Sequence, residues 1–189
     1  MNAAALNKLV QLMVVVLGFF VTLQLLIVQV VSGAAPPMRA AVTLAFAVGL
    51  AVRYWWVILL LPWPARWFRM VLLLLVWSSM PVVAIASADP IHWALALTAL
   101  SAMGCMTEAY NGITRQWQVG SEEVARSLKG DHVAGAVAAG LAIPLLLLAA
   151  LFLPEWIDVL IPLMVLADWA RLIAMIRRHQ RFIDRGYLT

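Results

Sequence analysis

Charged residues are scarce in this sequence. Only 12 % of its 189 residues are Asp, Glu, Lys or Arg, whereas soluble domains contain about 25 %. Apolar residues reach 65 %, and the mean hydropathy is +0.97. Such a composition predicts a membrane protein. The formal charge of +4 is then expected to set orientation in the membrane, and no nucleic-acid partner is expected.

Reactive and metal-binding side chains are also few. Cys105 is the only cysteine, which excludes an intrachain disulfide and a Cys-pair metal site. The three histidines, His92, His132 and His179, fall at segment ends or in the tail, so no haem is expected between the helices. No lysine lies inside an apolar segment, which excludes a retinal Schiff base. The motifs of zinc proteases and nucleophile-elbow hydrolases are missing. We therefore expect no enzyme, no metal and no cofactor.

Long apolar segments are what the sequence has in abundance. A membrane-spanning helix needs about 20 mostly apolar residues, and six segments qualify. They cover residues 9–31, 39–61, 67–86, 91–113, 132–153 and 156–176, followed by a polar tail at 177–189. The first segment is too long for the apolar part of a cleaved signal, which spans about 7–15 residues. We expect an all-α, multi-pass membrane protein with one transmembrane domain.

The basic residues predict how the chain is oriented. An even number of spans places both termini on one side of the membrane. Ten basic residues fall on that side: Lys8, Arg66, Arg69, Arg115, Arg126, Lys129, Arg177, Arg178, Arg181 and Arg185. Only Arg39 falls on the other side. Because basic residues accumulate on the cytoplasmic side, we expect both termini to be cytoplasmic and the membrane to be the inner, or plasma, membrane.

Local signals predict where some helices begin and end. Asp89 precedes a proline, so it is a candidate N-cap of the fourth span. Residues 121–130 predict either a short surface helix that stops at Gly130 or a solvated loop. Asp131 is then a candidate N-cap of the fifth span. Three prolines are expected to interrupt spans, each either as a break on a transport path or merely as a kink: Pro81, Pro144 and Pro162.

Five polar residues lie inside the apolar segments, at similar predicted depth: Arg53, Glu108, Asn111, Asp168 and Arg171. A charge near the bilayer centre costs about 2.5–3.5 kcal/mol on insertion scales. Asp168 and Arg171 are three residues apart and are expected to pair on one helix. Arg53 is expected to meet Glu108 or Asp168 across helices. The cluster is either a structural network that locks helices together or a site that handles protons, ions or an anionic group.

Two functions are kept open by these features. The first is a structural or assembly subunit of a larger inner-membrane complex, such as secretion, conjugation or transport machinery, with other subunits or further copies of the chain as partners. The second is a small solute or ion transporter that uses the charged cluster. The arginines of the tail are expected to continue the last helix and to contact lipid or a partner: Arg177, Arg178, Arg181 and Arg185.

Overall fold

The structure, a computed structural model, describes residues 3–60, 67–114 and 122–186. These residues form six α-helices: α1 (Ala3–Val31), α2 (Pro37–Leu60), α3 (Trp67–Ala86), α4 (Pro90–Thr114), α5 (Glu122–Phe152) and α6 (Ile157–Asp184). One 3₁₀ turn, Pro154–Trp156, joins α5 to α6. Arg66, Arg115, the expected helix start at Ser121 and the last three residues of the tail lie outside the described residues.

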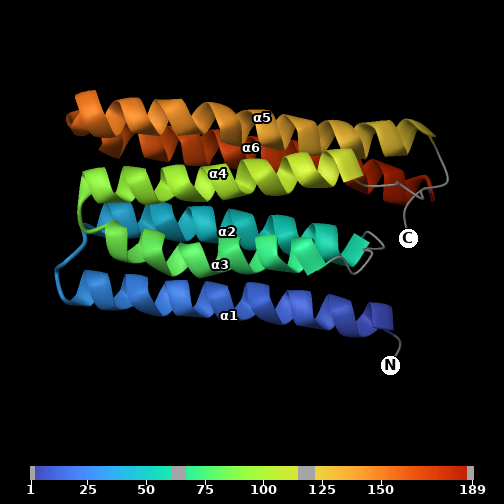
Figure 1. Ribbon diagram of the computed structural model, residues 1–189, viewed down its shortest axis with the longest axis horizontal. Coiled ribbons are helices and arrows are strands. Elements are labelled where there is room, and N and C mark those ends of the chain that lie inside the picture. The colour runs from blue at the N-terminus through green and yellow to red at the C-terminus, as the bar shows by residue number, and fades with distance from the viewer. Residues whose placement is uncertain (1–2, 61–66, 115–121, 187–189) are drawn as a thin grey trace.

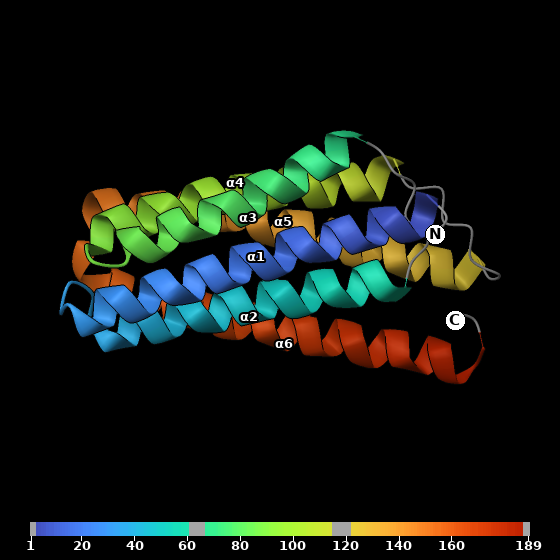
Figure 2. The same ribbon diagram turned by 90° about the horizontal axis from the view of Figure 1, so that it is seen from below.

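The helices run side by side along one common direction (Figure 1). α1 packs against α2 and α3, α3 packs against α4, and α4 packs extensively along α5. α6 closes the bundle by packing against α2 along its length and touching α5 and α4 more sparsely. The start of α1 and the end of α6 lie at the same end of the bundle (Figures 1 and 2).

The outer surface of the bundle is apolar, as a hydrocarbon environment requires. Leu17 and Phe20 of α1 are about three-fifths exposed on this surface, and Leu141 and Leu151 of α5 are at least as exposed. By length and composition, five helices are apolar enough to cross a membrane, and these are α1, α2, α3, α5 and α6. The described residues are therefore all-helical, and their five long apolar helices fit a helical membrane protein.

The interior of the bundle depends on close helix contact at a few small residues. Trp77 of α3 is buried in the core and lies directly on Gly18 of α1. A Cβ atom at Gly18 would stand 2.9 Å from the Trp77 side chain. Only glycine lets these two backbones approach so closely.

The predicted start of the fourth span at Asp89 is confirmed, whereas the predicted helix ends at Gly130 and Asp131 are wrong. Asp89 caps α4 as predicted, because its Oδ1 accepts the backbone N–H of His92 at 2.9 Å. The expected stop at Gly130 and N-cap at Asp131 are wrong, since α5 continues unbroken from Glu122 to Phe152. Val124 and Leu128 are fully buried, so packing inside the bundle holds the first turns of this helix.

The expected proline breaks are absent from the described helices. Pro81, Pro144 and Pro162 lie inside α3, α5 and α6, each of which runs on past its proline. The helix was correctly expected to continue beyond residue 176, since α6 reaches Asp184.

Candidate functional site

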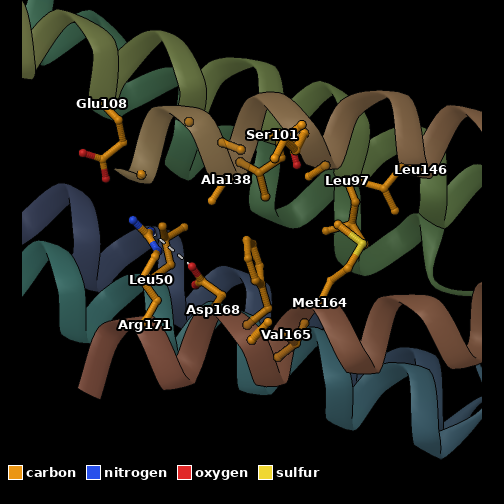
Figure 3. A pocket seen from close by; sticks show the side chains of 18 of the residues that line it. Leu50, Leu97, Ser101, Glu108, Ala138, Leu146, Met164, Val165, Asp168 and Arg171 are labelled. Carbon is orange, nitrogen blue, oxygen red and sulfur yellow. Dashed lines mark hydrogen bonds and ion pairs between the residues drawn. The ribbon is translucent and has the colours of Figure 1, made fainter. Parts of the chain in front are cut away.

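A cavity of about 310 Å³ lies between α2, α4, α5 and α6. Most of its wall is apolar and includes Phe46, Leu100, Leu146 and Met164. Charged side chains gather at one end. Figure 3 shows Asp168 and Arg171 rising from α6 toward Glu108, which descends from α4. The cavity thus combines an apolar body with a charged end.

Three of the charged residues form a triad. The Asp168 Oδ1 atom accepts hydrogen bonds from Arg53 Nη2 at 2.7 Å and from Arg171 Nη2 at 3.2 Å. The three side chains are only 14–27 % exposed. The Asp168–Arg171 pair was expected from the sequence, and of the two carboxylates expected to meet Arg53, it is Asp168 that does so. The triad carries one more positive than negative charge, because two guanidinium groups share one carboxylate oxygen.

Glu108 has a partner that sequence reasoning missed. His132 Nδ1 of α5 lies 2.5 Å from Glu108 Oε2, and both side chains are largely buried. The sequence placed His132 at the membrane boundary because α5 was expected to begin there. Since α5 in fact begins at Glu122, His132 lies more than two turns inside it, at the level of Glu108. A histidine–carboxylate pair at this distance can share or transfer a proton.

Gly135 makes room for the charged end of the cavity. A Cβ atom here would stand 2.8 Å from Arg171 Nη1 and 3.0 Å from the carboxyl carbon of Glu108. The Arg171 and Glu108 side chains therefore meet over the backbone of α5. A larger residue would push both of them away.

Asn111 does not join this end of the cavity, although the sequence placed it at a similar depth to the charged residues. It is buried but is not one of the residues that line the cavity. One turn of α4 separates it from Glu108. Cys105 of α4 is likewise outside the lining, while Ser101 and Gly104 line the cavity.

A second polar network ties α2, α5 and α6 together beyond the charged end. Asp131 of α5 lies 3.0 Å from His179 Nε2 and 2.9 Å from Arg178 Nη1, both on α6. Trp56 Nε1 of α2 donates to His179 Nδ1 at 3.2 Å. Asp131 therefore holds two side chains of α6, although it was expected to cap a helix.

At the opposite end of the bundle, α2 and α6 are joined again. Arg39 Nε and Nη2 donate to the two carboxylate oxygens of Asp158 at 2.6 and 2.8 Å. Arg39 Nη1 also donates to the carbonyl of Ala88 at 3.2 Å. Between the two ends, Trp169 Nε1 donates to the carbonyl of Ala45 at 3.0 Å. α6 is thus fixed to α2 along its whole length.

The arginines of the tail fall into two groups. Arg178, Arg181 and Arg185 line a hollow of about 320 Å³ with Glu123 of α5. Arg177 is exposed and does not line this hollow. The predicted contact of these residues with lipid or a partner stays a prediction.

The chemistry open to the site is that of binding and proton exchange. In residues 3–60, 67–114 and 122–186, no group of three or more His, Cys, Asp or Glu side chains could hold a metal ion. The cavity offers two arginines for an anion and two carboxylates for a cation or proton. No protein-family model, curated protein or solved structure matches the chain.

Proposed function

We propose that the chain crosses the inner, or plasma, membrane six times as one transmembrane domain, with both termini in the cytoplasm. Five helices are apolar enough, and α4 is the sixth because it has comparable length and packs between α3 and α5. α4 is more polar because residues such as Ser101 and Glu108 face the cavity. The concentration of basic residues at one end supports this orientation.

Single introduced cysteines test this topology. In a Cys105→Ser background, Glu155→Cys should react with a membrane-impermeant maleimide added to intact cells. Glu123→Cys should react only after the membrane is opened. The reverse pattern would overturn the proposed orientation, and labelling of both sites in intact cells would overturn the number of spans.

For function, the geometry best supports a small transporter that binds its solute in the cavity. The observation that most supports a transporter is that the charged side chains border an open cavity of about 310 Å³. A purely structural ion-pair network needs no such space, because protein interiors pack densely and leave few voids larger than a water molecule. The arginines would bind an anionic group, while Glu108 and His132 would take up or release a proton or cation.

A structural or assembly subunit of a larger inner-membrane complex is the second candidate. It is favoured by the pairing of the four charges inside the cluster, with Arg53 and Arg171 on Asp168 and Glu108 on His132. Such pairing is what a network that locks helices together requires. Other subunits, or further copies of this chain, would then contact its apolar outer surface or its basic tail.

Purification in a gentle detergent separates the two candidates. A transporter should elute as a monodisperse monomer or small oligomer and should gain thermal stability from its solute. A subunit should elute with stoichiometric partner proteins and show no ligand-dependent shift across a panel of small ions, organic acids and amphiphiles. Stoichiometric partners without a ligand-dependent shift would refute the transporter.

A further inference from the structure

The cavity opens sideways, through the wall of the bundle, between α5 and α6. Leu141 and Leu145 of α5 line it and are also 61 % and 48 % exposed on the outer surface. Ala138 and Ala167, on the two sides of the opening, are exposed lining residues as well. In a membrane this opening faces lipid hydrocarbon, so a ligand that is already in the bilayer reaches the cavity directly.

The size and walls of the cavity suit one hydrocarbon chain. Pockets for small ligands measure about 300–1,000 Å³, and this one, at about 310 Å³, lies at the small end. Leu50, Leu97 and Val165 add further apolar wall, against which an alkyl chain packs without exposing polar atoms.

The charged end suits an anionic head group. The triad carries an excess positive charge, and the Arg171 side chain lines the cavity with 27 % of its surface exposed. Its guanidinium group can therefore donate charge-assisted hydrogen bonds to a carboxylate or phosphate oxygen in the cavity. Glu108 adds one negative charge beside the triad, and a proton on His132, whose Nδ1 lies 2.5 Å from Glu108 Oε2, would cancel it.

From these observations we propose that the cavity binds an amphiphile with a single hydrocarbon chain and an anionic head group, which enters from the bilayer between α5 and α6. The head group is either a carboxylate or a phosphate monoester, because both have oxygens that match a guanidinium group. This inference rests on the proposed function, since it names the class of solute that the cavity would carry.

Tryptophan substitutions at the mouth provide the test, and the chain offers a matched control for each. Ala138→Trp and Ala167→Trp would fill the opening from α5 and α6. Ala134→Trp and Ala170→Trp place the same bulk on exposed alanines of the same helices that do not line the cavity. All four positions face outward, so folding should be preserved, and thermal unfolding of each variant checks this.

Binding should be measured on the purified protein in phosphatidylcholine nanodiscs. The probes are dodecanoate and dodecyl phosphate, with dodecyltrimethylammonium and dodecanol as chain-matched controls. We expect saturable binding of one or both anionic probes. Binding of the cation and of the alcohol should be weaker by about tenfold or more, because neither offers an anionic oxygen to the guanidinium groups. The two anionic probes distinguish carboxylate from phosphate as the preferred head group.

The mouth variants should weaken anionic binding by about tenfold or more, while the two control variants should leave it within about twofold. Arg171→Gln should remove the preference for dodecanoate over dodecanol, and Arg171→Lys should retain part of it. Equal binding by all four tryptophan variants, or equal affinity for the cationic probe, would overturn the inference. These tryptophan variants remain decisive even where an Arg171 variant fails to fold.

Failure of the inference is distinguishable from failure of the proposed function. If no amphiphile binds saturably but a water-soluble solute stabilises the protein and Ala138→Trp removes that shift, the cavity is still a solute site and only the amphiphile is wrong. If no solute of either kind binds, both proposals are wrong.

Discussion

Removing the shared acid of the triad should destabilise the protein strongly. Asp168→Asn removes the carboxylate that accepts hydrogen bonds from both Arg53 and Arg171, at 2.7 and 3.2 Å. Hydrogen bonds to charged groups contribute about 1.5–3 kcal/mol each, and losing one member of a buried pair costs about 3–5 kcal/mol. Asparagine still accepts one neutral hydrogen bond, so we expect a loss of about 3 kcal/mol in the free energy of unfolding.

Asp158→Asn is the matched control for this change. Asp158 is the same residue type on the same helix, and it also pairs with an arginine of α2, namely Arg39. Its side chain is 50 % exposed, so the pair is hydrated or contacts head groups. Exposed ion pairs contribute about 0–1 kcal/mol. The free energy of unfolding should therefore fall in Asp158→Asn by less than one third as much as it falls in Asp168→Asn.

The triad also predicts how stability is restored. A double change at Asp168 and one arginine leaves the second arginine unpaired, so the complete replacement is Arg53→Met, Asp168→Leu and Arg171→Met. Replacing a whole buried ionic group by apolar residues is often neutral or stabilising. Unfolding by SDS titration in mixed micelles measures all of these variants. A stability of Asp168→Asn equal to that of the parent would refute burial of the triad.

Three further changes test other parts of the account. Gly135→Ala should lower the free energy of unfolding by about 1–3 kcal/mol through overpacking. Gly130→Ala in the same helix, where a Cβ meets nothing within 4 Å, should raise it by about 0.5–1 kcal/mol. Equal effects of the two changes would contradict the close approach at Gly135. Asp89→Ala should cost about 0.5–2 kcal/mol through loss of the cap, and Asp89→Ser should restore most of it, as SDS unfolding would report. His179→Leu should cost about 1–3 kcal/mol, because it leaves polar groups of α2 and α5 unsatisfied, and an unchanged unfolding midpoint would show that the network beyond the cavity is not formed.

Most helix boundaries could be predicted from the sequence, because the thickness of the hydrocarbon layer sets the length of each apolar segment and polar loops separate the segments. The third span, 67–86, matches α3 in full. The α5 helix is different, because Gly130 and Asp131 carry local stop and start signals that tertiary packing overrides. Burial of Val124 and Leu128 depends on neighbouring helices, and a linear sequence does not state it.

The charged site, too, was predictable from the sequence only in part. Arg53, Asp168 and Arg171 were expected to pair because their depth and charge match, and such reasoning needs only the span boundaries. His132 was missed because its depth follows from the true start of α5, although a histidine near a span end with Glu108 at similar depth was a usable signal. The cavity itself depends on how far α6 stands from α4 and α5, which is a property of packing in three dimensions.

Native mass spectrometry of the protein released from its own membrane tests most directly whether the cavity is a binding site. We expect the parent and Ala134→Trp to retain a small molecule that is released on collisional activation, and Ala138→Trp to retain none. We also expect the mass of the protein to correspond to the chain alone or to a small number of copies of it. A parent protein with an empty cavity that is held in stoichiometric complex with other subunits would contradict the transporter and leave the charged cluster a structural network.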